Sequence, residues 1–96
     1  MELHQLLESI CDEKSFLEFV AALRQDRELD VAAEAALPSA AYCHGNRGWE
    51  NITIESFLAA AHAWAEDTRF GADQGLSAAS PWKKFAVFLY CGKIYE

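Results

Sequence analysis

The sequence has few cysteines, few basic residues and no long hydrophobic run. Its three cysteines, Cys11, Cys43 and Cys91, are far apart, odd in number and form no Cys-x-x-Cys pair, so no disulfide framework is indicated. Eight basic residues against fifteen acidic ones give a net charge of −7, which argues against binding of a nucleic-acid backbone. No window approaches the roughly 18 consecutive apolar residues that cross a membrane.

The sequence also lacks targeting and metal-binding signals. Its first ten residues, MELHQLLESI, contain neither the basic region nor the apolar stretch of a secretory signal. Together with the unpaired cysteines, this predicts a reducing, cytoplasmic location. Cys43 and His44 are adjacent in an expected loop, without the spacing of zinc-ligand pairs. We therefore expect no metal and no cofactor, and the role of this Cys-His pair stays open.

What the chain does contain is enough apolar material for a core. Its 96 residues are 52% hydrophobic, with three tryptophans, six phenylalanines and three tyrosines. This length predicts one domain spanning residues 1–96. A domain so small is only marginally stable, by about 5–10 kcal/mol.

The clearest element is a helix within residues 48–67. Thr53 is a good N-cap, because its hydroxyl can accept from the free amides of the first turn. Glu55 lies in the first turn, where a carboxylate interacts favourably with the positive end of the helix dipole. The apolar residues after Thr53 recur at helical spacing and predict one core-facing stripe. This stripe consists of Ile54, Phe57, Leu58, Ala61, Trp64 and Ala65.

Three further segments have helical patterns. Residues 2–10 carry leucine and isoleucine at helical spacing, and Ser15 with Glu18 forms a capping-box signature for a second helix. Helix-forming residues then continue to Leu37, as one long helix or as two with a break near Asp30. Ser80 followed by proline predicts the start of the last helix.

The fold class follows from these patterns. We expect an all-α domain of four or five helices with bundle-like or orthogonal packing, because no strand pattern is convincing. The expected loops are residues 38–48, after a proline, and residues 70–79.

The last helix is apolar on several sides. Such a helix is either central to its domain or half of an oligomer interface. We expect part of it to be covered by a second copy in a two-fold contact. The candidate dimer surface consists of Val87, Phe88, Cys91, Ile94 and Tyr95.

Two features of the central region have both a structural and a functional interpretation. Trp49 precedes the helix in a polar turn, either as a cover over the helix start or as an exposed anchor for a partner. Glu66 and Asp67 lie at the carboxyl-terminal end of the helix, where negative charge interacts unfavourably with the helix dipole. A salt bridge with a neighbouring cation would offset this cost, and we favour that interpretation. With His62 they are also the candidate site of a small enzyme or ligand binder.

Negative charge gathers at the amino-terminal end. Residues 1–37 hold nine acidic and three basic side chains, a net of −6 out of −7. A field of one sign attracts an oppositely charged protein. We therefore predict that a basic partner protein docks on this segment and on the neighbouring loop. The candidate interaction residues are Glu28, Glu34, Tyr42, Arg47 and Trp49.

Two motifs resemble those of a known family. The motifs are W-E-N-x-T-I-x-x-F-L-x-A-x-x-A-W-x-E-D from Trp49 and P-W-x-x-F-A-x-x-L-Y-x-G-K-x-Y-E from Pro81. Together with residues 16–26, they are similar to a family of small bacterial proteins, a domain of unknown function. The resemblance implies a bacterial cytoplasmic protein and carries no activity, cofactor or catalytic residue. The residues that match motif positions are Trp49, Asn51, Thr53, Trp64, Asp67, Trp82, Gly92, Lys93 and Tyr95.

Three functions remain as hypotheses. The first is a non-enzymatic protein-interaction module of the immunity or regulatory type that binds a basic protein. The second is a homodimeric structural protein without a further ligand. The third is the small enzyme or ligand binder at His62 and Glu66/Asp67.

Overall fold

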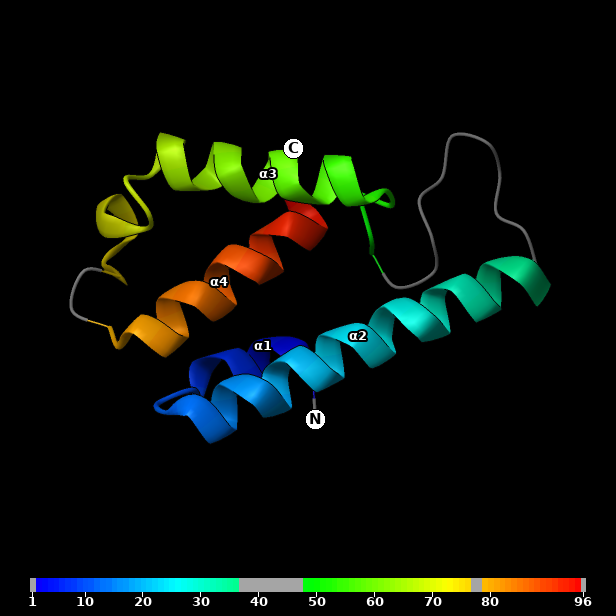
Figure 1. Cartoon of the computed structure of the whole chain (residues 1–96), viewed down its shortest axis with the longest axis horizontal. Helices are drawn as coiled ribbons and strands as arrows, with labels where there is room; N and C mark the ends of the chain where they lie inside the picture. The colour runs from blue at the N-terminus through cyan, green and yellow to red at the C-terminus, as the bar shows by residue number, and fades with distance from the viewer. Residues whose placement is uncertain (1, 37–47, 77–78, 96) are drawn as a thin grey trace.

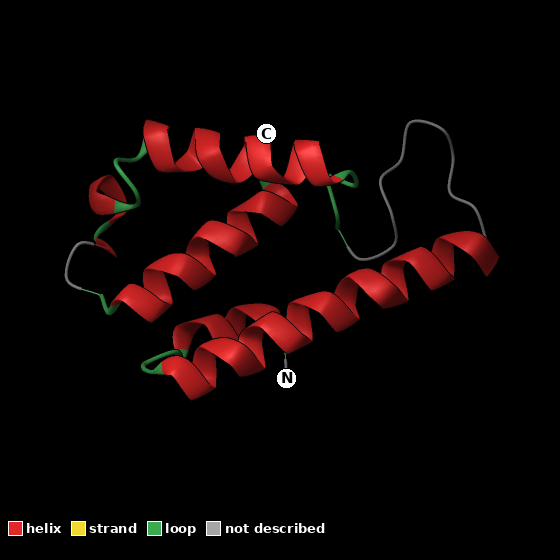
Figure 2. Ribbon diagram, viewed as in Figure 1, coloured by secondary structure: helices red, strands yellow, loops and turns green. Residues whose placement is uncertain are grey.

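The computed structural model describes residues 2–36, 48–76 and 79–95. These residues form four α-helices and one short 3₁₀ helix, and they contain no strand (Figure 2). The prediction of an all-α fold is therefore confirmed. The elements are α1 (Leu3–Glu8), α2 (Glu13–Ala36), α3 (Ile54–Asp67), η1 (Ala72–Gln74) and α4 (Pro81–Ile94).

Helix α4 occupies the centre of the arrangement. It packs against α3 on one side and against α1 and α2 on the other. Figure 1 shows α4 between α3 and the pair of amino-terminal helices, with the carboxyl-terminal part of α2 extending beyond the other helices. The several apolar sides of α4 therefore have neighbours within one chain, as expected of a helix that is central to its domain.

Helix α2 begins three residues earlier than predicted. The carboxylate of Asp12 accepts from the Ser15 amide at 2.8 Å, and the Ser15 hydroxyl accepts from the Asp12 amide at 3.1 Å. Asp12 thus caps the helix, and the prediction of a cap at Ser15 is wrong because the reciprocal pair lies one turn earlier. The Ser15 amide and hydroxyl both donate to the Asp12 carboxylate, and these two hydrogen bonds lower the pKa of that carboxyl.

The open question about the second helix is settled in favour of one element. Helix α2 runs without a break from Glu13 to Ala36. Asp30 does not interrupt it, because the carboxylate accepts from the Arg27 guanidinium one turn earlier at 2.8 Å. Asp30 is 1% exposed, so this ion pair brings an acidic residue into the core.

The predicted starts of the other two long helices are confirmed. The Thr53 hydroxyl accepts from the Ser56 amide at the start of α3, and the Ser80 hydroxyl accepts from the Lys83 amide at the start of α4. Pro81 takes the first position of α4, where it has no amide hydrogen to leave unpaired.

The predicted core stripe of α3 is right at Phe57, Ala61 and Trp64 and wrong at Ile54 and Leu58. Ala61 and Trp64 are 0% and 2% exposed, whereas Ile54 and Leu58 are 79% and 54% exposed. The reason is that α3 packs against α4 and not directly against α2, so the side of its first turns that faces α2 is left uncovered. No helix of the described residues covers Ile54 and Leu58.

The expected loop after α3 is a compact turn that contains η1. Arg69, Phe70 and Gly71 all have positive φ angles, which reverse the chain. The strain at the first two residues is offset by packing and by hydrogen bonding. The Phe70 ring stacks on Phe88 with centroids 5.5 Å apart, and the Thr68 hydroxyl accepts from the Gly71 amide.

Candidate functional site

A buried ion pair joins the middle of α2 to the end of α4. The Lys93 ammonium donates to the Asp26 carboxylate at 2.8 Å, and both side chains are 9% exposed. The same carboxylate oxygen accepts from the indole nitrogen of Trp49 at 2.8 Å. Because a lone charge in the interior is costly, this pair holds α2, α4 and the chain before α3 in one arrangement.

Trp49 lies at the centre of this cluster. Its ring is 4% exposed and stacks on Phe57 with centroids 6.2 Å apart. The Arg27 guanidinium and the Lys93 ammonium lie 5.6 and 5.4 Å from the ring centroid, within cation–π distance. The sequence analysis gave Trp49 two alternative roles, a cover over the start of α3 or an exposed anchor for a partner. The burial of the ring and its contact with Phe57 in the first turns of α3 agree with the first role.

A second set of hydrogen bonds fixes the carboxyl-terminal end of α4. The Asn51 side-chain amide donates to the carbonyls of Gly92 and Tyr95, at 3.0 and 2.9 Å. The Tyr95 hydroxyl donates to Asp67 at the end of α3, at 2.6 Å, and this hydrogen bond raises the pKa of the phenol. Asn51 before α3 and Asp67 at its end therefore hold the carboxyl-terminal end of α4 in place.

Gly92 allows the closest approach between α3 and α4. A Cβ atom at this position would lie 2.8 Å from two carbons of the Phe57 ring. Real contacts of Cβ atoms are longer, so a side chain here would force the two helices apart. The glycine therefore has a packing role.

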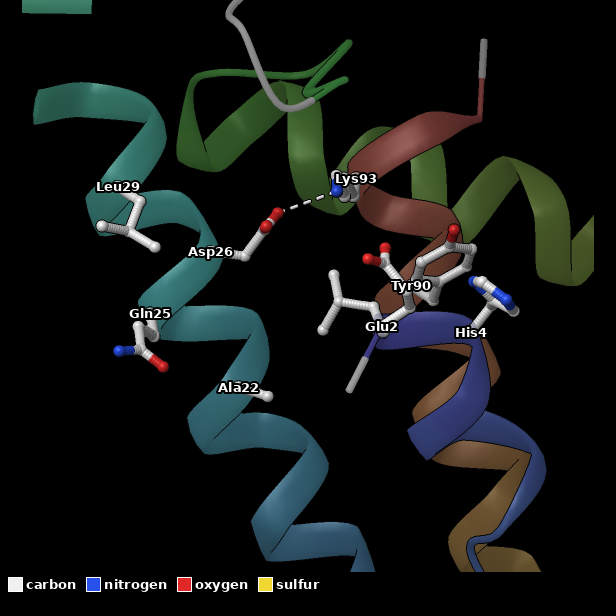
Figure 3. A pocket seen from close by; sticks show the side chains of 9 residues that line it. Glu2, His4, Ala22, Gln25, Asp26, Leu29, Tyr90 and Lys93 are labelled. Atoms are coloured by element: carbon white, nitrogen blue, oxygen red, sulfur yellow. Dashed lines mark hydrogen bonds and ion pairs between the residues drawn. The ribbon is translucent and has the colours of Figure 1, made fainter. Parts of the chain in front are cut away.

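A small pocket lies beside the ion pair, between α1, α2 and α4 (Figure 3). Its volume is about 250 Å³, and its polar lining includes Glu2, His4, Gln25 and Tyr90. Figure 3 shows the Lys93 ammonium directed from α4 across to Asp26 on α2. The pocket is smaller than the ~300–1,000 Å³ of typical ligand sites, and its buried lysine is already neutralised by a carboxylate.

A larger apolar groove lies between α2 and α3. Its volume is about 480 Å³. Ile52, Ile54 and Leu58 along its α3 side are 59%, 79% and 54% exposed. Exposed apolar side chains gathered along one groove are typical of a surface that binds another molecule. The groove is lined by Val20, Leu23, Arg24, Arg27, Trp49, Asn51, Ile52, Thr53, Ile54, Phe57, Leu58 and Leu89.

The charged residues that line the groove are two arginines of α2. Arg27 is bound to Asp30 and donates to the carbonyl of Ile52 at 3.3 Å, so this arginine bridges α2 and the start of α3. Arg24 forms an ion pair of 3.5 Å with Glu28, in which both side chains are more than half exposed. Such an exposed pair contributes little stability and can be exchanged for other partners.

The structure places the predicted interaction residues in different surroundings. The Glu28 side chain is 61% exposed on α2, and Trp49 is buried beneath the groove. Tyr42, Arg47 and the side chain of Glu34 lie outside the described residues, as do Cys43 and His44. Of the five, the structure thus brings two into the neighbourhood of the groove.

The predicted dimer surface is divided among the sides of α4. Cys91 is buried, Phe88 stacks on Phe70, and Tyr95 is bonded to Asp67. Val87 is half-buried, and Ile94 is 41% exposed. Burial raises the pKa of the Cys91 thiol to about 11, so this thiol stays protonated near neutral pH.

The alternative site at the end of α3 consists of separate contacts. The His62 ring contacts the Glu66 carboxylate at 2.9 Å, with side chains 73% and 66% exposed. Asp67 accepts from Tyr95 instead, and Arg69 pairs with Asp73. In place of the expected salt bridge with a neighbouring cation, Glu66 therefore contacts His62 and Asp67 accepts a hydrogen bond from Tyr95.

Among the residues that the structure describes, no group of three His, Cys, Asp or Glu side chains has the placement of a metal site. No described helix is both long and apolar enough to cross a membrane.

The sequence analysis missed the Asp26–Lys93 pair and the bridging role of Arg27. A signal was present, because Asp26 and Asp30 continue the helical stripe of Phe19 and Leu23. A carboxylate on an apolar stripe of a helix needs a buried partner. Lys93 lay in the quoted motif, yet its partner 67 residues away became apparent only in the folded chain.

Fold and site together define a small acidic all-α protein with a buried ion pair and an exposed apolar groove. The chain belongs to a family of unknown function, DUF7660, whose model matches residues 12–96. Comparison with curated proteins and with solved structures finds no match.

Proposed function

We propose that this protein is a non-enzymatic interaction module, of the immunity or regulatory type, that binds a basic partner protein. The observation that carries the proposal is the exposure of Ile52, Ile54 and Leu58 beside an apolar groove. Exposing three large apolar side chains together is unfavourable in water. A partner that covers them would regain this free energy on binding.

The charge of the chain indicates the kind of partner. Glu2, Glu8, Asp12, Glu13 and Glu18 are exposed, and none of them takes part in an ion pair with another described residue. With a net charge of −7, the protein attracts cationic surfaces and repels acidic ones. Such steering raises association rates and weakens as salt screens it.

The experiment is capture of proteins from a bacterial lysate on the immobilised chain. We expect a basic protein to bind at least tenfold more weakly when salt rises from about 50 to 500 mM, because the Debye length falls from roughly 14 to 4 Å. Glu28→Lys, alone or with Glu34→Lys, should slow association more than it speeds dissociation.

A matched variant shows whether the effect of Glu28→Lys depends on the position of the residue or only on the net charge of the protein. Glu66→Lys changes the net charge by the same amount as Glu28→Lys, at a side chain 66% rather than 61% exposed, but on α3 far from the groove. We expect it to slow association less. If no captured protein is lost on Glu28→Lys, or if both reversals act equally, the proposed interaction at this face is contradicted.

The homodimeric alternative has its own support and its own test. Phe85 and Ile94 on α4 are 50% and 41% exposed, so apolar area is available for a second copy. Sedimentation at micromolar concentration should then give a dimer that Ile94→Asp weakens. A strictly monomeric mass would remove this alternative.

A further inference from the structure

We infer that the groove between α2 and α3 receives a single amphipathic helix of the partner, with cationic side chains on both flanks of its apolar stripe. This inference rests on the proposed function and names the part of the partner that the groove recognises. Four features of the groove carry it: its apolar lining, its continuation along α2, its acidic margins and the helical nature of its walls.

The lining suits a stripe of apolar anchors. Val20 and Leu23 on α2 and Phe57 and Leu58 on α3 provide apolar surface on both sides, with Leu89 of α4 contributing between them. The groove is open to solvent along its length, because Ile54 and Leu58 at its margin are more than half exposed. Helix-binding grooves take apolar side chains that recur at positions i, i+3, i+4 and i+7.

The apolar surface continues beyond the groove along the same helix. Val31 lies one turn after Arg27, on the face of α2 that carries Val20 and Leu23, and it is 51% exposed. Val31 belongs to the carboxyl-terminal part of α2, and this end of the helix extends past α3 and α4 (Figure 1). An elongated partner element lying beside α2 would cover this continuation, whereas a compact ligand would not.

The margins of the groove favour cations on the partner. Glu28 on α2 follows Arg27 directly, and Glu55 on α3 lies between Ile54 and Leu58 in the first turns. Neither glutamate is part of the lining itself, whose charged residues are Arg24 and Arg27. Both arginines are already paired with a carboxylate, Arg24 weakly with Glu28 and Arg27 with Asp30, whereas Glu55 makes no ion pair with another described residue. A lysine or arginine on each flank of the bound helix would therefore meet one carboxylate on each wall.

The walls also decide between a helix and an extended strand as the occupant. Both walls are helices, and the described part of the chain contains no strand whose edge could pair with an added one. An extended peptide in an apolar groove would leave its backbone amides and carbonyls unpaired, which is costly. A helix satisfies these groups within itself.

The test uses model peptides in place of the unidentified partner. The probe is a peptide of leucine and lysine, about 15 residues and ~22 Å long as a helix, with leucine at i, i+3, i+4 and i+7. Two controls are a peptide with glutamate in place of lysine and a leucine–lysine peptide without the stripe. We expect calorimetry to show binding of the first peptide at least tenfold tighter than of either control.

Two groove variants locate the site on the protein. Ile54→Asp and Leu58→Asp replace exposed side chains, and an acidic residue at the first position of α3 is compatible with the helix dipole. The matched control is Leu17→Asp on α2, where leucine is 55% exposed and does not line the groove. We expect at least tenfold weaker binding for the two groove variants and less than twofold change for Leu17→Asp, with unchanged helical content in all three.

The margins are tested by neutral variants. Glu28→Gln with Glu55→Gln should weaken binding of the lysine peptide and reduce its dependence on salt, because two carboxylates no longer meet cations. Unchanged affinity and salt dependence would contradict the flanking contacts.

Failure of this inference is distinguishable from failure of the proposed function. Equal binding of the lysine peptide to wild type and groove variants, or no binding, would overturn the helix-in-groove assignment, while the captured basic protein would still support an interaction module. A wild-type dimer that becomes monomeric on Ile54→Asp would also overturn it, because the occupant is then a second copy. A captured protein that binds all variants equally would place the interaction elsewhere on the surface.

Discussion

Asp26 and Lys93 are 67 residues apart in the sequence, and their charged groups lie 2.8 Å apart in the interior. Each belongs to a different helix, and the indole of Trp49 donates to the same carboxylate oxygen. A buried pair of this kind adds little net stability over apolar residues, but it strongly disfavours arrangements that leave either charge unpaired. It therefore fixes how α2, α4 and the chain before α3 meet.

The first prediction concerns this pair. Lys93→Met should lower the free energy of unfolding by roughly 3–5 kcal/mol, because it removes the buried cation that pairs with the Asp26 carboxylate at 2.8 Å. Asp26→Asn in the Lys93→Met background should recover part of the loss, since asparagine still accepts from Trp49 without a charge. Urea denaturation measures both values.

The control for the Asp26–Lys93 pair is an exposed ion pair on α2. Arg24→Met removes the cation of the exposed pair with Glu28 and should change the free energy of unfolding by about 0.5 kcal/mol or less. If the losses of the Asp26 and Lys93 variants simply add, the two side chains are not coupled in the folded protein.

The second prediction contrasts two residues of α3. Trp64→Ala should lower the free energy of unfolding by roughly 3–5 kcal/mol, because the ring is 2% exposed and its removal leaves a cavity. Ile54→Ala should cost about 0.5 kcal/mol or less, because this side chain is 79% exposed. Thermal unfolding followed by circular dichroism compares them. Similar melting temperatures for the two variants would contradict the orientation of α3.

The third prediction concerns the contact of Gly92 with Phe57. Gly92→Ala should lower the free energy of unfolding by about 1–3 kcal/mol, because the new methyl group meets the ring at 2.8 Å. This loss exceeds the gain of up to ~1 kcal/mol that alanine brings to a helix. Combining Gly92→Ala with Phe57→Leu should make the alanine less costly, as urea denaturation of the four proteins would show. An alanine tolerated beside the intact ring would argue against this helix contact.

The fourth prediction is a pH dependence that comes from Cys91. Burial raises the pKa of its thiol from 9.0 to about 11. Between these values the unfolded chain loses the proton and the folded chain keeps it, so the free energy of unfolding falls as pH rises. Cys91→Ala should show a smaller fall when urea denaturation is repeated from about pH 8 to 10.5.

Thiol alkylation provides an independent readout of the same burial. In a Cys43→Ser background, the exposed Cys11 should react with iodoacetamide well before Cys91. Equal rates for the two thiols in the folded protein would contradict the burial of Cys91.

Local sequence patterns were sufficient to predict the helices. The caps at Thr53 and Ser80 and the apolar repeats depend on residues within one or two turns, so they can be recognised without the fold. The same applies to the all-α class. The start of α2 was misplaced because Asp12 and Ser15 form one capping pair and Ser15 with Glu18 resembles another.

The candidate site was less accessible to prediction. Glu28 and Trp49 were selected from charge and composition, but the groove appeared only once Ile54 and Leu58 were found outside the core. Helical periodicity shows which residues share a face, and does not show which part of that face a neighbouring helix covers.

What the sequence by itself determined is where the helical segments lie, to within a few residues at their ends, and the acidic character of the chain. It left open whether residues 16–37 form one helix or two. What the tertiary structure decided is the pairing of Asp26 with Lys93, the burial of Trp49 and the exposed groove between α2 and α3. The physical reason is range: caps and helical repeats act over a few residues, whereas these features depend on α4 packing between segments far apart in the chain.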